Sequence, residues 1–314
     1  MSAQKPVFSI ITPVYNGEDY LRETIESVLR NATGYSFEYI IINDGSTDGS
    51  QDILNSYSDS VRIFSQPNSG ESSAVNKGLS LATGTLALIV SADDPILTPR
   101  LFEGVEQIFE SSPNLAALYP NWNLINSEGE TVKTIKVPDF SFELLIGDCR
   151  TLPGPGTFFR TSFANQIGGR NAKWKFVGDL DFWLRLSQVG EIRHRPEVVA
   201  QWRSHSGSTS IAQRGSEMAL ERIHVMETFF ENYSIDSVLM RRARGSSYYM
   251  AARLAFFSTR VPGKKYLFNS FLYRRGVPET ASLAVVLYIV FLPLSRWLVN
   301  PFYLFLNKHK TQVN

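Results

Sequence analysis

The sequence predicts an α/β fold in which a mostly parallel central sheet is flanked by helices. Apolar runs of strand length alternate with segments of helical spacing over the first 90 residues. Acidic residues closely follow two of these runs, Asp44 in one case and Asp93 with Asp94 in the other. Because ligand-binding loops lie at the carboxyl ends of parallel strands, the same pattern predicts where the functional site is.

The composition is that of a folded protein with one large domain and a smaller addition. The chain has 314 residues, of which 43% are hydrophobic and 19% charged, so disorder is not expected. Cys149 is the only cysteine, which excludes an intrachain disulfide and favours a reducing compartment. The first apolar run, residues 7–11, is too short for a signal-peptide core, so secretion is not expected.

The chain opens with a βαβ pattern. Residues 7–12 form the first predicted strand, and residues 13–17 form a turn because of their Pro and Asn-Gly content. Residues 18–29 have the apolar spacing of a helix, and residues 37–42 form a second strand. Asp48 is suited to cap the helix that follows.

The stretch from Asp44 to Asn55 shares features with the calcium loop of an EF-hand. Asp44, Ser46, Asp48 and Gly49 match its first half. The twelfth position, a bidentate Glu in such loops, is Asn55, and a strand rather than a helix precedes the stretch. We therefore expect no EF-hand here.

A third strand is predicted over residues 61–64, followed by a loop and a helix that contains residues 74–78. Small and polar residues on the first turns of this helix leave backbone N–H groups available to an anion, and Lys77 adds positive charge. A diphosphate would suit this place. No P-loop and no Gly-x-Gly-x-x-Gly pattern follows a predicted strand, so the common nucleotide fingerprints are absent.

Residues 86–90 form a predicted buried strand that ends near the carboxylates of Asp93 and Asp94. Carboxylates at such a point can hold a hard divalent cation or a ribose hydroxyl. An alternative of equal weight is that Asp94 caps a helix beginning at Pro95.

The second half begins with two strands, residues 118–125 and 131–135, around a turn. Residues 153–157, Pro-Gly-Pro-Gly-Thr, form a loop that either borders an acceptor pocket or merely connects two elements. The pattern turns helical after Ser210. This change predicts two domains, residues 1–215 and residues 216–314.

The net charge of +1 hides two surfaces of opposite sign. The first 240 residues hold nineteen basic and twenty-nine acidic residues, whereas residues 241–314 hold twelve basic residues and one acidic residue. A basic, aromatic segment indicates nucleic acid or an anionic membrane. The apolar run 281–294, followed by the apolar residues 302–306, favours the membrane and no nucleic acid.

The apolar run is shorter than the roughly 20 residues of a membrane span, and it contains Pro293. Cations flank it on both sides, which favours both ends on one face of a bilayer. We expect an interfacial or re-entrant element at the cytoplasmic face of the cell membrane. The alternative is a buried helix pair.

Four motifs in order resemble glycosyltransferase family 2. They are Thr12-Pro-Val-Tyr-Asn16, Asn43-Asp-Gly-Ser-Thr-Asp48, Gln66-Pro-Asn-x-Gly70 with Ala74, Asn76 and Gly78, and Ala92-Asp-Asp94. The resemblance covers about 85 residues and implies the GT-A fold, which is Rossmann-like. It also implies that the chain consumes a nucleotide-sugar.

The resemblance assigns expected roles within a nucleotide-sugar site. It implies that Asp44 reads the base and that Asp93 helps to hold Mg²⁺ or Mn²⁺ on the donor diphosphate. Ser91 stands where many relatives carry a further Asp. The resemblance therefore implies that the metal is bound more weakly here or by fewer carboxylates. The residues expected to bind the donor are Pro13, Tyr15, Asn16, Asp44, Ser46, Asn68, Asn76, Lys77, Asp93 and Asp94.

The stretch Phe176-Val-Gly-Asp-Leu-Asp-Phe-Trp-Leu-Arg-Leu186 is similar to the acceptor-side motif of the same family. Asp179 has the position of the general base, although Gly178 stands where an acid is usual. From the residues alone, Asp179 could equally be a helix cap. The later Arg203-Ser-His205 is similar to the family's Arg-x-His stretch, which makes His205 a candidate metal ligand or diphosphate contact.

These expectations combine into an inverting transfer of a sugar from a nucleotide-diphosphate sugar, most simply a UDP-sugar, to a hydroxyl of a glycan or lipid-linked acceptor. One base suffices for such a reaction. The cationic, apolar tail suggests a role in bacterial surface polysaccharide or O-antigen synthesis. Two alternatives stay open: a nucleotidyltransferase of related fold, and an inactive nucleotide-binding module that Ser91 and Gly178 would mark.

Overall fold

The computed structural model describes residues 5–147, 153–205 and 215–256, together with residues 266, 269–270 and 272–273. Its contacts divide the chain into two compact units, residues 1–146 with 150–212 and residues 147–149 with 213–314. The apolar runs 281–294 and 302–306, Cys149 and Ser210 lie outside the described residues.

The first unit is built on one eight-stranded sheet with the order β3-β2-β1-β4-β7-β5-β6, and β8 also pairs with β5. The pairs β1–β2, β2–β3, β1–β4 and β5–β8 are parallel, and β6 and β7 run antiparallel to their neighbours. The strands are β1 Phe8–Val14, β2 Phe37–Asn43, β3 Arg62–Ser65, β4 Leu86–Ile89, β5 Leu115–Ile125, β6 Thr131–Ile135, β7 Phe158–Arg160 and β8 Glu191–Arg203.

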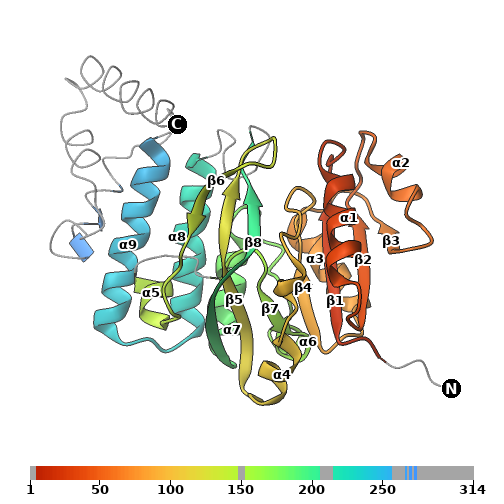
Figure 1. Ribbon diagram of the computed structural model, residues 1–314. Coiled ribbons are helices and arrows are strands. Elements are labelled where there is room, and N and C mark those ends of the chain that lie inside the picture. Colours follow the sequence, from red (N-terminus) through yellow and green to blue (C-terminus); the bar gives the residue numbers. More distant parts are fainter. Residues whose placement is uncertain are drawn as a thin grey trace. The chain divides into compact units, whose positions relative to one another are not determined.

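Helices lie on both faces of the parallel half of the sheet (Figure 1). Figure 1 shows α1 in front of β1 and β2, with α3 drawn fainter behind them. The helices are α1 Leu21–Ala32, α2 Ser50–Asn55, α3 Glu71–Leu81, α4 Val105–Glu110, α5 Phe142–Gly147, α6 Thr161–Gln166 and α7 Gly178–Leu186, with the 3₁₀ turn η1 Pro99–Leu101.

The alternation of side chains along β2 explains the two helical layers. Ile41 belongs to the large core that contains Leu21, Ile25 and Val28 of α1. Its neighbour Ile40 points to the other face, where it packs with Ala74 of α3. Side chains along a strand alternate between faces, so a run of isoleucines can supply both cores at once.

Helix α3 lies unusually close to β1, and Gly78 permits it. A β-carbon at position 78 would come within 2.4 Å of the Ile11 Cγ2 atom. Any other residue there would push the helix away from the sheet. Two members of the third motif, Ala74 and Gly78, are therefore packing residues.

The predicted βαβ opening and the strand pair 118–125 and 131–135 are confirmed, with two local corrections. Strand β1 extends to Val14, so Pro13 lies within the strand rather than in a turn. No helix begins at Pro95; the backbone is irregular there, and the next helical turn is η1, which Thr98 caps. The prediction that Asp94 caps a helix is therefore wrong.

The described part of the second unit is helical, as its sequence predicts. It contains α8, Gly215–Asn232, and α9, Ser237–Phe256. Arg244 of α9 pairs with Glu227 of α8, with Nη2 and Oε2 2.7 Å apart. Over the residues that can be described, no helix has the length and apolar character that a membrane crossing requires.

Candidate active site

Loops that follow β1, β2 and β4 meet at one edge of the sheet. These strands are parallel neighbours, so their carboxyl ends lie together. A β-carbon at Gly17, after β1, would be 3.3 Å from the Ala92 β-carbon after β4. The predicted residues of the first, second and fourth motifs are thus gathered at this edge.

Asn16 and Ser46 hold the first two loops together. Asn16 adopts the left-handed conformation with φ +52°, and its side-chain oxygen accepts the Thr47 N–H at 2.8 Å. The Asn16 N–H in turn donates to the Ser46 hydroxyl at 3.1 Å. Asn tolerates positive φ better than most residues, so it can make this turn and bridge the loops as well.

Asp44 is buried and organises the loop between β3 and α3. Its Oδ1 accepts the Ser69 N–H at 2.9 Å and the Gln66 amide at 2.7 Å, and its Oδ2 accepts the Gly70 N–H at 2.8 Å. A carboxylate can accept about four hydrogen bonds, so one acceptor position is left for a ligand donor such as a base N–H. Asp44 therefore holds residues 66–70 in position. It also lies where the family resemblance expects the residue that reads the base.

The backbone of this loop passes directly over Gly45. Gly45 has φ +74°, and a β-carbon there would be 2.8 Å from the Asn68 nitrogen. We expect Gly45→Ala to displace residues 66–70 and to weaken nucleotide binding at least tenfold, in addition to backbone strain of about 1–2 kcal/mol. Urea denaturation and calorimetric titration with UDP measure the two effects.

Gly34→Ala is the matched control for this variant. Gly34 also has positive φ, +92°, but a β-carbon there would meet no atom within 4 Å from other described parts of the chain. It should show a comparable loss of stability with unchanged nucleotide binding. Equal effects of the two substitutions on UDP affinity would contradict the role given to Gly45.

Asp93 and His205 meet although 112 residues separate them. Asp93 Oδ2 lies 2.9 Å from His205 Nε2, and the side chains are 29% and 18% exposed. The Tyr20 ring packs beside the imidazole, with centroids 4.8 Å apart. The two residues predicted as metal ligands are thus brought together at the solvent edge of the site.

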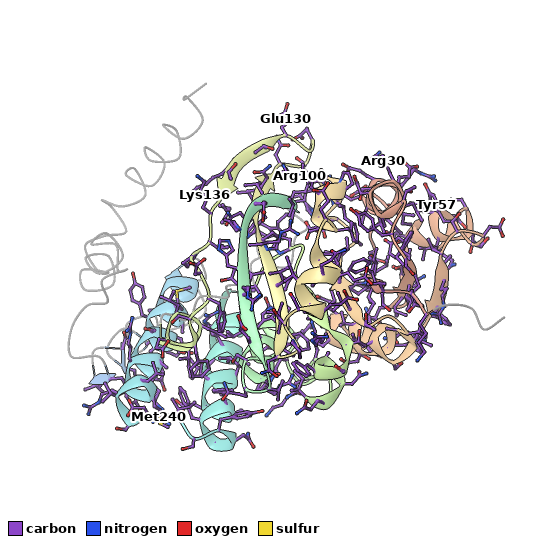
Figure 2. All side chains as sticks on the ribbon, turned by 60° about the horizontal axis from the view of Figure 1, so that its bottom comes forward. Arg30, Tyr57, Arg100, Glu130, Lys136 and Met240 are labelled. Atoms are coloured by element: carbon purple, nitrogen blue, oxygen red, sulfur yellow. The ribbon has the colours of Figure 1, made fainter. Side chains whose placement is uncertain are left out.

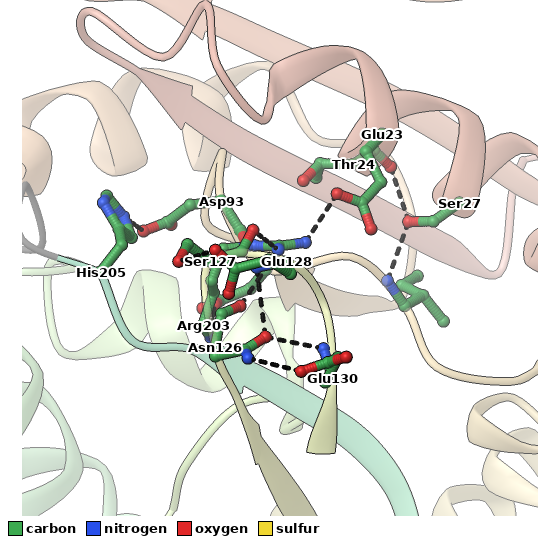
Figure 3. A network of polar contacts seen from close by, with 12 residues as sticks. Glu23, Thr24, Ser27, Asp93, Asn126, Ser127, Glu128, Glu130, Arg203 and His205 are labelled. Carbon is green, nitrogen blue, oxygen red and sulfur yellow. Dashed lines mark hydrogen bonds and ion pairs between the residues drawn. The ribbon is translucent and has the colours of Figure 1, made fainter. Parts of the chain in front are cut away.

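Arg203 fixes the backbone that carries this pair, and it is absent from the predicted site. Its side chain is 1% exposed, and its Nε donates to the Asp93 carbonyl at 3.0 Å. Figure 3 shows it at the centre of a polar network that also includes Glu23, at 2.6 Å, and the carbonyls of Asn126 and Ser127. The guanidinium also stacks on Tyr20, 4.6 Å from the ring centroid.

Asp94 is buried and hydrogen-bonds to the backbone of Arg203, the last residue of β8. Its Oδ1 accepts the Arg203 N–H at 2.7 Å, and Ser91 donates a further hydrogen bond from its side chain. Burial, together with the neighbouring charge of Asp93, raises the pKa of Asp94 well above its usual range. Ser91 stands where the family resemblance leads us to expect an acid, and its side chain hydrogen-bonds to Asp94.

A small pocket opens beside this strand end. Ser91 and Asp94 line it together with Pro155 and Gly156 of the loop that follows α5 and with Gln201 of β8. The loop at 153–157 therefore borders a pocket next to the candidate site.

The other residues predicted to bind the sugar donor differ in their exposure and in the hydrogen bonds that they form. Tyr15 is 52% exposed, Asn68 is exposed, and Pro13 is partly buried. Lys77 donates to the Ser65 carbonyl at 2.7 Å, so its ammonium group is tied to the end of β3. The ammonium group has three donors, so two are left for the predicted contact with a diphosphate.

The Asn76 side chain forms its hydrogen bonds with the backbone of a distant segment. Its amide nitrogen donates to the Arg170 carbonyl at 2.6 Å, and its oxygen accepts the Arg170 N–H at 2.7 Å. The Asn76 amide thus pairs with the N–H and the carbonyl of Arg170, as the backbone of a neighbouring strand would. It shapes the site by fixing the segment that leads to α7.

Asp179 lies in the first turn of α7 and is partly buried. A helix N-terminus favours negative charge, so this position suits a carboxylate base. The preceding Gly178 packs on α3, where a β-carbon would be 2.7 Å from the Ser72 hydroxyl. This contact gives a steric reason for glycine in place of an acid.

Asp181 has a separate structural role. It pairs with Arg185 at 2.5 Å, and Arg185 also donates to the carbonyls of Ile167 and Gly169. The Asp181 carboxylate is therefore engaged by Arg185. Of the two aspartates on α7, Asp179 stays the candidate for the chemistry.

The chemistry of the Asp93–His205 pair fits a divalent cation. Within the described ranges, no three side chains of His, Cys, Asp or Glu gather as a metal site. A carboxylate oxygen and an imidazole nitrogen are ligands that Mn²⁺ accepts, whereas Mg²⁺ prefers oxygen. The pair suits a cation whose other ligands are diphosphate oxygens and water.

Residues 9–145 match the family model described as Glycosyl transferase family 2. TuaG of Bacillus subtilis (strain 168), a glycosyltransferase named for teichuronic acid biosynthesis, is 33% identical over 261 residues, covering 77% of this chain and all of TuaG. An uncharacterized glycosyltransferase of Rickettsia felis is 28% identical over 272 residues, 83% of this chain. The matched region spans only 44% of that Rickettsia protein.

Two solved structures have a similar fold. TarS 1–349 of S. aureus in complex with UDP-GlcNAc is 16% identical, with a TM-score of 0.59, and the match covers 87% of this chain and 90% of that one. The mannosyltransferase PcManGT of Pyrobaculum calidifontis, in complex with GDP-Man and Mn²⁺, is 13% identical, with a TM-score of 0.57 and coverage of 98% and 86%. These likenesses confirm the predicted GT-A fold.

Proposed function

Because the chain belongs to glycosyltransferase family 2, we propose that it transfers a sugar from a nucleotide-diphosphate sugar to a hydroxyl group with inversion at the anomeric carbon. The observation that carries the proposal is that the Asp44 loop and the Asp93–His205 pair lie at the same edge of the sheet. A UDP-sugar is the simplest donor, since TarS, which shares the fold, has been solved with UDP-GlcNAc.

Asp179 acts as the base in this proposal. Its carboxylate takes the proton of an acceptor hydroxyl while that oxygen attacks the anomeric carbon and the bond to the diphosphate breaks. Inversion needs no covalent sugar–enzyme intermediate, so no second carboxylate nucleophile is required.

Residues at the opposite end of the bond favour departure of the diphosphate. Asp93 and His205 would hold Mg²⁺ or Mn²⁺, which supplies charge neutralisation for the leaving nucleoside diphosphate. Arg203 keeps the Asp93 backbone in place, and Asp44 holds the backbone of the 66–70 loop beside the proposed nucleotide site. Preorganised groups of this kind stabilise developing charge without rearranging during the reaction.

The proposed acceptor is a glycan or a lipid-linked sugar in bacterial surface polysaccharide synthesis. The similarity to TuaG supports this class of product. The basic residues of 241–314, twelve against one acid, support attachment to an anionic membrane surface at its cytoplasmic face. In this proposal, residues 1–215 form the catalytic domain and residues 216–314 the membrane-facing region.

Thermal denaturation with nucleotides tests the proposed donor site. We expect one of UDP, GDP, dTDP and CMP to raise the Tm, and the rise to be larger with Mn²⁺ present. A ligand at 100 times its Kd stabilises by about 2.7 kcal/mol, which a Tm readily reports. Asp93→Ala should remove the Mn²⁺-dependent part of the rise.

The exposed Asp59 supplies the control, since Asp59→Ala should leave both parts unchanged. No Tm rise with any of the four nucleotides would overturn the proposal in favour of a degenerate binding module. Release of pyrophosphate in place of a nucleoside diphosphate during turnover would instead identify a nucleotidyltransferase.

A further inference from the structure

The segment from Gly169 to Val177, directly before the helix that carries Asp179, is held at both ends by α3. At its start, the Asn76 amide binds both backbone groups of Arg170, and Arg170 Nη1 pairs with Glu71 at 2.6 Å. Towards its end, the Ser72 hydroxyl donates to the Trp174 carbonyl at 3.3 Å. The backbone of the segment is therefore rigid enough to form a binding surface.

Two exposed lysines alternate with two aromatic residues on this rigid segment, in the order Lys173-Trp-Lys-Phe176. Lys173 Nζ lies 4.7 Å from the Trp174 ring centroid, and Lys175 Nζ lies 5.5 Å from the Phe176 centroid. Neither ammonium group forms an ion pair with any carboxylate in the described part of the chain. Each aromatic ring thus lies beside a lysine ammonium group, and no carboxylate in the described part of the chain neutralises that charge.

Buried donors in the same segment also lack partners. The Trp174 indole N–H is buried in a side chain that is 3% exposed, and it has no hydrogen-bond partner within the described residues. Arg170 Nε is likewise buried and unpaired in that part of the chain. Buried donors in native proteins are nearly always satisfied, so these two mark a segment whose polar groups the described residues do not fully pair.

We propose that Lys173 and Lys175 bind a phosphate group of the acceptor and so place the acceptor hydroxyl at Asp179. This inference rests on the proposed function, and it adds that the acceptor substrate is anionic. The tetrahedral charge of a phosphate suits two ammonium groups with rotatable donors, whereas a carboxylate is matched better by the planar fork of Arg. The acceptor phosphate belongs either to a lipid carrier or to a soluble sugar phosphate.

Calorimetric titration of the full chain with four probes tests the inference. Dodecyl phosphate represents a lipid carrier and glucose 1-phosphate a soluble sugar phosphate, with dodecyl maltoside and glucose as uncharged counterparts. We expect one phosphate probe to bind at least tenfold more tightly than its counterpart, and Lys173→Ala/Lys175→Ala to remove that difference.

Lys133→Ala/Lys136→Ala is the matched control pair. Both residues are exposed on or next to β6, and Figure 2 shows Lys136 at the surface, so this variant should keep the phosphate preference. Equal binding of charged and uncharged probes, or a preference unchanged in the Lys173/Lys175 variant, would overturn the inference.

The UDP-dependent rise in Tm, measured with Mn²⁺ in the same variants, separates this inference from the proposed function. We expect Lys173→Ala/Lys175→Ala to keep that rise in full. A loss of UDP binding in this variant would assign the lysines to the donor and overturn the inference, while the proposed function would stand. Absence of a UDP response in the unchanged chain would overturn the proposed function itself.

Discussion

An Asp179→Asn variant is expected to fold normally, to bind UDP as the unchanged chain does, and to lose about 10²- to 10⁴-fold in turnover. The amide keeps the size of the side chain in the first turn of α7 but cannot accept the proton of the acceptor hydroxyl. Steady-state rates of nucleoside diphosphate release measure the loss. Near-normal turnover would remove Asp179 from its assigned role.

The neighbouring Asp181→Asn separates catalysis from support of the helix. Asp181 is buried and paired with Arg185, so its substitution breaks a charged pair and should cost about 3 kcal/mol of unfolding free energy. Turnover of the fraction that remains folded should change little. A large loss of turnover in Asp181→Asn with intact stability would exchange the roles of the two aspartates.

An Arg203→Leu variant is expected to lose about 2–3 kcal/mol of unfolding free energy, because it removes a buried guanidinium that donates several charge-assisted hydrogen bonds. The partners are the carboxylates of Glu23 and Asp94 and the carbonyls of Asp93, Asn126 and Ser127, and of these Asp94 alone keeps its bond, which comes from the backbone. Urea denaturation measures the change.

Arg193→Leu, on the same strand, is the control. Arg193 is 40% exposed and pairs with Glu191, a surface pair worth no more than about 1 kcal/mol. Should Arg203→Leu prove as mild as Arg193→Leu, the network in Figure 3 would not be what holds the end of β8 against Asp93.

The parallel half of the fold could be predicted because its strands are continuous apolar runs, as in Tyr39–Ile42. Strand β8 could not, because it is rich in charged residues and contains Pro196. The structure resolves the conflict with a bulge: Arg195 pairs opposite Pro120 and Val198 opposite Asn121, which leaves Pro196 outside the ladder. Strand β7 is too short, at three residues, to give a periodic signal.

The candidate site was predictable where motif residues follow strands directly, as Asp44 and Asp93 do. The meeting of Asp93 with His205 depended on family resemblance, since nothing local links residues 112 positions apart. Arg203 was visible only as the first residue of the Arg203-Ser-His205 motif. Its structural role could not be predicted, because four of its hydrogen bonds involve backbone groups, which carry no sequence identity.

The double hydrogen bond between Asn76 and Arg170 has a consequence for how this enzyme can diversify. It fixes one end of a short stretch, and the close packing of Gly178 on Ser72 fixes the other. The exposed residues between them, such as Lys173 and Lys175, can therefore change without shifting the helix that carries Asp179. Under the proposed function, a change of acceptor would then need substitutions only at these exposed positions, with the proposed donor site and Asp179 left as they are.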